Sequence, residues 1–404
     1  MKIFSLPGKG SKPAVLTDAT SLRMSQHLQA YLPALLELAE RVVVVVTDAA
    51  ETVFLKKVTD FNATELVGIP WESIKAVVHT ADPSFLTIQL RIEKEAAESR
   101  IPVIRLEDIP GACFRTDITD SNERMGATAN FYGVVNQTGK EIALAQGIAP
   151  TCLHIIGVPD WQHPDPARVA TLQQLRGSWK KGIGYQEDDY LTFFSTTSQF
   201  AVDQAALKAV LEAYQIIGGV LLIGLHPKLD PARYVGQDSA QAQLMLERSA
   251  AYLGFLGQQG FKELGSETGA AVVYSLKGIP GLFTLGCGEL ATDFPSDILP
   301  CDLFLSGFDN SAFFNNSWGT PALNLCSPEV QAAHQVAVGT PFPMAVTSGA
   351  LPRLTKHDEM VQTIIKAYHN PEHYLVSSKK LLETVPYAGA VSVRRIRELV
   401  ERAL

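Results

Sequence analysis

Two histidines stand directly after runs of branched aliphatic residues, at points where a buried strand would end. His226 follows "VLLIGL" and precedes Pro227 and Lys228, and His79 ends "AVVH" with Asp82 three residues later. A histidine in such a position can act as a general base on a hydroxyl or, when protonated, donate a hydrogen bond to a phosphate. The alternative is a histidine that bonds neighbouring backbone, and for His79 the two interpretations stay open.

Other polar residues follow predicted strands in the same way. Glu107 and Asp108 come after "VIRL", and Ser306 and Gly307 come after "LFL". Ligands of parallel α/β sheets bind outside the carboxyl ends of the strands, so these positions are candidates for a site.

Several common motifs of enzyme sites are missing from the sequence. It has no D-x-D pair, no H-E-x-x-H, no close His/Cys cluster and no G-x-S-x-G, so we expect no metal and no cofactor. The glycine-rich stretch "LPGKGSKP" (6–13) offers N–H groups, Lys9 and Lys12. It lacks the spacing of a phosphate-binding loop, and we interpret it either as a phosphate contact or as an exposed loop.

Short aliphatic runs alternate with helical patterns along the chain, which predicts parallel α/β sheets. The predicted strands are 42–46, 76–79, 103–106, 131–135, 153–156, 191–195, 220–225, 271–274, 282–285, 303–306 and 322–325. The predicted helices are 20–40, 84–99, 137–147, 201–214 and 241–256, with two or three more in 357–404.

The chain length indicates two domains, because 404 residues exceed one ordinary core. A polar, proline-rich stretch at 160–185 marks the junction. We expect two tandem Rossmann-like domains, 1–170 and 171–385, with a ligand cleft between them, followed by a C-terminal helix at 386–404. That end is amphipathic and basic, and it either packs on the N-terminal domain or touches a membrane surface.

Composition narrows the choice of partners. The net charge is −8 and neither half of the chain is basic, which argues against a nucleic-acid partner. The five cysteines form no C-x-x-C pair, and no apolar run is long enough for a signal or a membrane span. We therefore expect a cytoplasmic protein; peripheral contact with the inner face of a membrane is left open, as is the oligomeric state.

Four stretches in order resemble the GT-B glycosyltransferases, and most of all the CDP-glycerol glycerophosphotransferases. They are 131–162 with Gly157-Val158-Pro159, "YLTFFSTTSQ" (190–199), "LLIGLHPKLD", and 297–325 with Gly319-Thr320-Pro321. The resemblance covers residues 131–325. It implies that His226 faces the phosphates of a donor, and it is why we favour a functional role for this histidine.

The fourth stretch, which contains "SGFDNSAFFNN", would feed the start of a helix. A loop before a helix aims N–H groups at an anion, and Asn310 and Ser311 could add side-chain donors there. Many members carry a ribose-binding carboxylate where this chain has Phe314-Asn315-Asn316. Asn315 is the candidate for that role.

The resemblance implies metal-independent transfer of a glycosyl or glycerol-phosphate-like group from a nucleotide-activated donor to a hydroxyl acceptor, of the kind used in cell envelope polysaccharide biosynthesis. His226, Lys228, Ser306, Gly307, Asn310, Ser311 and Asn315 would bind the donor, and His79 or Asp82 would be the base, with His226 also at the reacting centre. Two alternatives stay open. One is a nucleotide-sugar epimerase on the same fold, and the other is a non-catalytic protein that closes over a small ligand.

Overall fold

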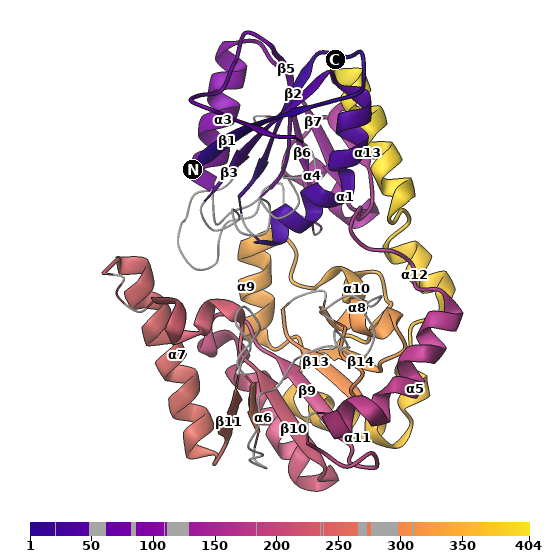
Figure 1. Cartoon of the computed structure of the whole chain (residues 1–404). Coiled ribbons are helices and arrows are strands. Elements are labelled where there is room, and N and C mark those ends of the chain that lie inside the picture. Colours follow the sequence, from indigo (N-terminus) through magenta and orange to yellow (C-terminus); the bar gives the residue numbers. More distant parts are fainter. Residues whose placement is uncertain are drawn as a thin grey trace. The chain divides into compact units, whose positions relative to one another are not determined.

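The chain forms two compact α/β units in the computed structural model (Figure 1). The structure describes residues 1–20, 22–47, 62–81, 86–108, 110, 129–182, 184–234, 236, 238–265, 273–275, 298–308 and 311–404. The N-terminal unit comprises Met1–His163, Val336–Thr340 and Leu382–Leu404, and the C-terminal unit comprises Pro164–Gln335 and Pro341–Leu381. The chain therefore enters the N-terminal unit three times.

The N-terminal unit is built on an eight-stranded sheet with the order β4-β1-β3-β2-β5-β6-β7-β8. Strand β1 is antiparallel to both of its neighbours, and the other pairs are parallel. The strands are β1 (Lys2–Pro7), β2 (Ala14–Ala19), β3 (Arg41–Val46), β4 (Thr64–Leu66), β5 (Ile74–Thr80), β6 (Val103–Leu106), β7 (Phe131–Val134) and β8 (Leu153–Ile155).

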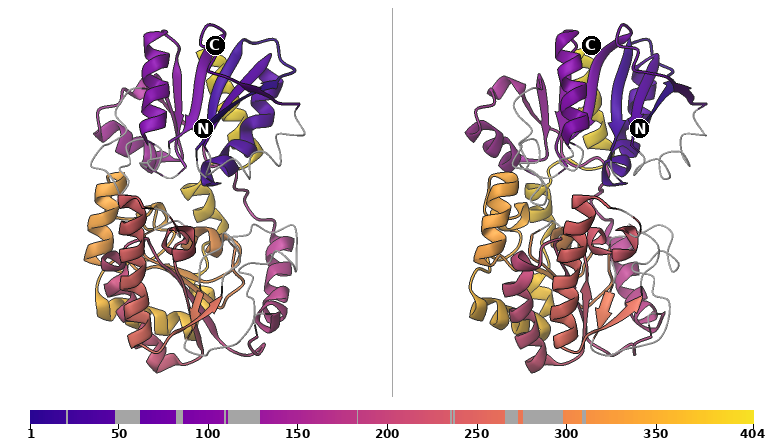
Figure 2. Two further views of the ribbon diagram at one scale, coloured as in Figure 1. Left: turned by 60° about the vertical axis from the view of Figure 1, so that its left-hand side comes forward. Right: turned by 90° about the vertical axis from the view of Figure 1, so that its left-hand side faces the viewer.

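Helices cover both faces of this sheet, which explains why β3 is an unbroken run of valines. Val42, Val44 and Val46 face one core, which helices α1 (Leu22–Leu38) and α13 (Ala390–Ala403) complete. Val43 and Val45 face the opposite core, completed by α3 (Leu86–Glu98). Figure 2 shows the same layering from two further directions. The 3-10 turn η4 (Pro150–Cys152) and helix α4 (Gln137–Ala145) lie between the later strands in sequence.

The C-terminal unit has a six-stranded sheet with the order β11-β12-β10-β9-β13-β14. Strands β10, β9, β13 and β14 are parallel, whereas β12 is antiparallel to both β10 and β11. The strands are β9 (Leu191–Ser195), β10 (Val220–Gly224), β11 (Lys262–Gly265), β12 (Val273–Ser275), β13 (Leu303–Ser306) and β14 (Ala322–Asn324).

The helices of this unit are α5 (Pro166–Gly182), α6 (Phe200–Ile217), α7 (Ala240–Gln258), α8 (Ser311–Ser317), α9 (Pro328–Val338), α10 (Met344–Thr347), α11 (His357–His369) and α12 (Ser378–Thr384). The last residues of α9 and of α12 belong to the N-terminal unit. The 3-10 turns are η5 (Pro227–Leu229), η6 (Pro231–Tyr234) and η7 (Pro371–Tyr374). Within the described part of the chain, no helix is both long and apolar enough to cross a membrane.

The prediction of two Rossmann-like α/β domains is confirmed. Strands β1, β2, β4 and β11 were not among the predicted strands, and the predicted strand at 282–285 lies outside the described residues. The units divide between His163 and Pro164, whereas the predicted boundary at 170 lies inside α5. Helix α13 contributes Ile396, Leu399 and Val400 to a core of the N-terminal unit.

Candidate functional site

In the C-terminal sheet the strand order reverses at β9. The chain runs from β9 through α6 to β10 on one side, and later returns to β13 on the other side of β9. Ligands of open α/β sheets bind at such a switch point, outside the carboxyl ends of the strands. Thr196, Thr197 and Ser198 follow β9 at this edge, and Gly307 follows β13. All four are buried.

His226 lies two residues beyond β10, at the same edge, and is half-buried. Its backbone N–H donates to Thr196 Oγ1 at 3.0 Å, which ties the loop after β10 to the loop after β9. Its ring Nδ1 accepts a hydrogen bond from the backbone N–H of Lys228 at 3.1 Å. Because Nδ1 is the acceptor, the proton of the neutral ring lies on Nε2, which makes Nε2 a donor.

Lys228 lies on the 3-10 turn η5, two residues after His226. Its backbone carbonyl accepts from the hydroxyl of Tyr234 at 2.7 Å, which anchors the turn. His226 and Lys228 thus both follow β10 at one strand end, and their role as donor contacts stays a prediction.

Ser306 and Gly307 end the neighbouring strand and are closely packed. Ser306 is buried, and Asn324 Nδ2 lies 3.4 Å from its hydroxyl oxygen. A Cβ at Gly307 would lie 3.2 Å from Val330 Cγ2 and 3.4 Å from Asp203 Oδ1. A larger residue at 307 would push against the carboxylate of Asp203.

Asn315 makes hydrogen bonds within the C-terminal unit through both polar atoms of its side chain. Its Oδ1 accepts from the backbone N–H of Leu299 at 2.8 Å, and its Nδ2 donates to the carbonyl of Ser311 at 3.0 Å. The side chain is buried and fastens α8 to the segment before β13. Ser311 begins α8, which has only seven residues, and Asn310 lies outside the described residues.

Asp203 and Tyr252 are two site-edge residues that sequence reasoning missed. Asp203 lies in the first turn of α6 and is fully buried; its Oδ2 accepts from the backbone N–H of Thr197 at 2.6 Å and from the hydroxyl of Tyr252 at 2.5 Å. The signal for Asp203 was a lone acidic residue in the apolar run "FAVDQAALKAV". Nothing in the sequence near Tyr252, on α7, indicates its partner.

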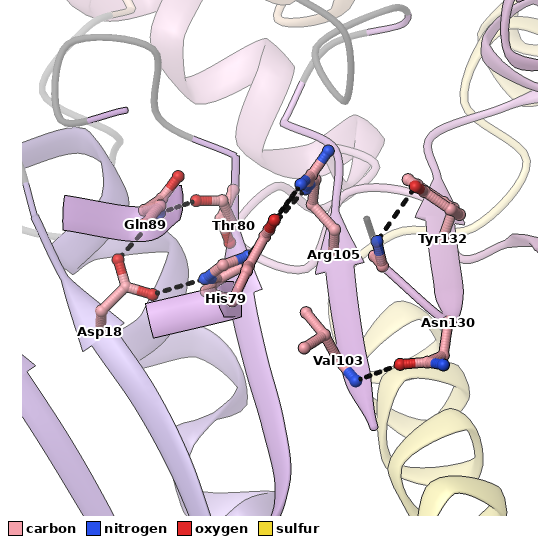
Figure 3. Close-up of polar contacts among 10 residues, drawn as sticks. Asp18, His79, Thr80, Gln89, Val103, Arg105, Asn130 and Tyr132 are labelled. Atoms are coloured by element: carbon pink, nitrogen blue, oxygen red, sulfur yellow. Dashed lines mark hydrogen bonds and ion pairs between the residues drawn. The ribbon is translucent and has the colours of Figure 1, made fainter. Parts of the chain in front are cut away.

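A buried charge network occupies the corresponding edge of the N-terminal sheet; we use this name for Asp18, His79, Glu93 and Arg105. Figure 3 labels Asp18, His79 and Arg105 of this network. His79 Nε2 lies 2.9 Å from Glu93 Oε1, and His79 Nδ1 lies 3.4 Å from Asp18 Oδ1. Arg105 donates to both oxygens of Glu93, each from Nη2 at 2.5 Å. The four side chains come from β2, β5, α3 and β6.

These contacts shift the pKa values of the network strongly. Burial alone would lower the pKa of His79, but hydrogen bonds and attraction from Asp18 and Glu93 outweigh it and raise the pKa to about 9. Burial alone would raise the pKa of Glu93, but His79 and Arg105 lower it to about 2. His79 is therefore a buried cation at neutral pH, and this state does not suit a general base.

Gln89 on α3 links the network to the end of β5. Its side-chain amide nitrogen, Nε2, donates both to Asp18 Oδ2 and to the carbonyl of Thr80, each at 2.8 Å (Figure 3). His27 on α1 lies on the other side, with Nδ1 2.7 Å from Thr80 Oγ1. Asp82, the other predicted base, lies outside the described residues.

The glycine-rich stretch 6–13 uses its N–H groups inside the protein. The N–H groups of Gly8, Lys9, Gly10 and Lys12 donate to carbonyls of residues 36–40, at and just beyond the end of α1. Those carbonyls would otherwise lack partners at a helix end. A Cβ at Gly8 would lie 1.9 Å from the carbonyl oxygen of Ala39, so only glycine permits this approach. The loop thus caps α1, and its amides do not form a phosphate cradle.

In the part of the chain that the structure describes, no three His, Cys, Asp or Glu side chains gather as a metal site would require.

No protein-family model matches the sequence, and no curated protein matches it either. Solved structures do match. A UDP-N-acetylglucosamine 2-epimerase from Rickettsia bellii has a TM-score of 0.55 at 10% identity over 97% of each chain. The same enzyme from Neisseria meningitidis, bound to UDP-GlcNAc, has a TM-score of 0.54 at 13% identity over 96% of this chain and 100% of that one. The fold of this chain is therefore of the GT-B type, with two Rossmann-like domains.

Proposed function

We propose that this protein is an enzyme that binds a nucleotide-activated sugar in its C-terminal unit and transfers the glycosyl, or a glycerol-phosphate-like, group to a hydroxyl acceptor without a metal. The observation that carries the proposal is the orientation of His226. Its ring is fixed by the Lys228 amide so that Nε2 is a donor at the carboxyl edge of β10.

In glycosyl transfer, the acceptor oxygen attacks the anomeric carbon, the bond from that carbon to the phosphate oxygen breaks, and a base takes the acceptor proton. The leaving diphosphate gains negative charge, and fixed donors aimed at it lower the barrier. His226 Nε2–H and the ammonium group of Lys228 would supply these donors. The buried hydroxyls of Thr196, Thr197 and Ser198 lie at the neighbouring strand end.

The base in this scheme is not His79, because a cation with a pKa of about 9 holds its proton at neutral pH. Asp82 stays a prediction for that role, as does acceptor binding in the N-terminal unit. Ser306, Gly307, Asn310 and Ser311 stay predicted donor contacts, whereas Asn315 fits better as an internal fastening of α8.

A nucleotide-sugar epimerase is the second candidate, since the solved structures of similar fold are UDP-N-acetylglucosamine 2-epimerases. Epimerisation needs acid–base groups that can take and return a proton at carbon. The buried carboxylates of Asp203 and Glu93 are held by hydrogen bonds to Tyr252 and Arg105, so neither is our candidate for such a group.

Nucleotide binding is the first test. UDP, CDP, GDP and ADP would each be added to the protein in a thermal-shift assay, and we expect one of them to raise Tm by several degrees through mass action. His226→Ala should abolish that shift. His357→Ala is the matched control, because His357 is exposed on α11 and pairs with Glu212 in the same unit. If no nucleotide raises the Tm of the wild type, both candidate functions are wrong.

The two reactions are separated by NMR with UDP-GlcNAc in D2O. A transferase releases UDP only when a hydroxyl acceptor is present and leaves the sugar C2 proton in place. An epimerase exchanges that proton for deuterium and produces a second sugar configuration without an acceptor. Exchange at C2 would overturn the transfer proposal.

A further inference from the structure

We propose that Asp203 and Tyr252 are positioning residues that hold His226 in its donor orientation; the inference rests on the proposed function. Neither residue lies on the loop that carries His226. They act on it through Thr196 and Thr197, which follow β9.

Asp203 is the fixed end of this arrangement. Its carboxylate is fully buried and lies in the first turn of the 18-residue helix α6, whose positive end favours a negative charge there. Oδ2 accepts from the backbone N–H of Thr197 at 2.6 Å. The carboxylate thereby fixes the start of the loop between β9 and α6.

Tyr252 extends the arrangement from α7. Its hydroxyl lies 2.5 Å from Asp203 Oδ2 and 3.0 Å from the carbonyl of Thr197. Burial, together with the charge of Asp203, raises the pKa of Tyr252 well above 10, so the hydroxyl keeps its proton. A carboxylate is the stronger of the two acceptors, and the single proton goes to Asp203.

Thr196 passes the constraint on to His226. Its Oγ1 accepts the backbone N–H of His226 at 3.0 Å, and its neighbour in the chain is Thr197, whose backbone N–H is held by Asp203. Its own backbone N–H donates to the carbonyl of Gly224, the last residue of β10, at 3.0 Å. The constraint therefore runs from Tyr252 to Asp203, from Asp203 to the backbone of Thr197, and from the adjacent Thr196 to His226.

Stability alone is a weak reason for such an arrangement. Burying a carboxylate and a phenol costs desolvation energy, and apolar residues of similar volume often serve a core as well or better. A buried polar chain that ends on a site residue instead fixes one geometry for it. Here the geometry fixed is the backbone position from which the His226 ring meets the Lys228 amide.

The test uses the full-length protein with 15N-labelled histidine and needs no ligand. The ring 15N shifts of His226, assigned by comparison with His226→Ala, report which nitrogen carries the proton. We expect wild type to show one Nε2–H tautomer, and Tyr252→Phe to show a mixture of tautomers. Tyr214→Phe is the control, because it removes a hydroxyl bonded to the carbonyl of Gly219 just before β10, at the opposite edge of the sheet.

The second readout is the UDP dissociation constant by calorimetry, which should rise about tenfold in Tyr252→Phe and stay at the wild-type value in Tyr214→Phe. Asp203→Asn keeps the shape and one acceptor oxygen, and it should give an intermediate result in both readouts. If Tyr252→Phe does not fold, Asp203→Asn decides.

Wild-type tautomer and affinity in a folded Tyr252→Phe, or in Asp203→Asn where only that variant folds, would overturn the positioning role. Failure of the wild type to bind UDP or any other nucleotide would instead overturn the proposed function, while the His226 shifts still test the positioning.

Discussion

The burial of His79 between Asp18 and Glu93 couples the stability of the N-terminal unit to pH. In the buried charge network, each of the two cations, His79 and Arg105, has the carboxylate of Glu93 at hydrogen-bond distance. Such a set is costly to break, because removal of one partner leaves the other buried without compensation.

We predict a loss of stability as the pH rises from 6.5 to 9. The pKa of His79 is raised from 6.5 to about 9, so the folded protein binds the proton more tightly than the unfolded chain. The resulting stabilisation is complete below pH 6.5 and disappears as the pH passes 9. It amounts to roughly 3 kcal/mol. Urea denaturation at pH 6 and pH 9.5 measures it.

His79→Gln should flatten this pH dependence, whereas His357→Gln, which changes an exposed histidine, should retain it. An equal change of stability with pH in wild type and His79→Gln would contradict the prediction.

At acid pH the dependence of stability on pH has the opposite sign. The pKa of Glu93 is lowered from 4.5 to about 2, so its stabilisation is present above pH 4.5 and is lost as the pH falls toward 2.

Sequence reasoning reached some of these residues and not others, for physical reasons. His226 and Lys228 were predictable because an aliphatic run that stops at a histidine marks a strand end. Asp18 was missed because Thr17 and Asp18 interrupt the aliphatic run of β2, "AVLTDA", so that it does not read as a buried strand. Tyr252 acts through a contact with Asp203, 49 residues away, which no local pattern records.

The segment after β8 shows how one glycine determines a crossing of two chain segments. Gly157 has φ of +84°, and a Cβ there would lie 1.9 Å from the carbonyl oxygen of Tyr387. The backbone of Val158 pairs with the segment before α13, donating to Tyr387 and accepting from Gly389. The first G-x-P motif is therefore a crossing point that joins the two ends of the N-terminal unit.

We predict that Gly157→Ala destabilises the protein far more than Gly147→Ala. Both glycines have positive φ, which costs about 1 kcal/mol for alanine. Gly147 has open space around it, whereas Gly157 would also force the backbone of Tyr387 to move, so we expect a total of about 3 kcal/mol or more. Urea denaturation of both variants measures the difference, and equal losses would show that the crossing yields easily.

At this scale the strands and helices were largely predictable, because strands buried on both faces read as aliphatic runs and helices carry their own period. The antiparallel direction of β12 was not, since the hydrophobic pattern of a strand does not contain its direction. The capping of α1 by residues 6–13 was also missed, because a glycine-rich loop suits a helix end as well as a phosphate.

At the scale of the molecule, α13 belongs to a core whose other members lie in the first 160 residues. Ile396, Leu399 and Val400 pack with α1 and β3, and Arg395 donates to the carbonyl of Ile155 at 2.7 Å. The apolar face of this helix is thus used inside the N-terminal unit. A membrane-surface role for this face is not what the packing favours.

We predict that Leu399→Ala weakens the N-terminal unit selectively. Loss of a buried leucine costs about 3 kcal/mol, and the loss should appear in hydrogen exchange as faster exchange of β1 to β3 amides. Amides of β9, β10 and β13 should exchange as in wild type. Val391→Ala, an exposed position on the same helix, is the control. Equal acceleration in both units would mean that they unfold as one.

The place of α13 in that core also sets an order of events during synthesis. Residues 164–335 and 341–381 contain every strand of the C-terminal sheet, so the residues of this core are all synthesised before those of α13. The N-terminal unit emerges first, but it cannot close its core until Ile396, Leu399 and Val400 have been added. The last core residues of the N-terminal unit are thus synthesised after those of the C-terminal unit, the reverse of the usual N-to-C order of domains.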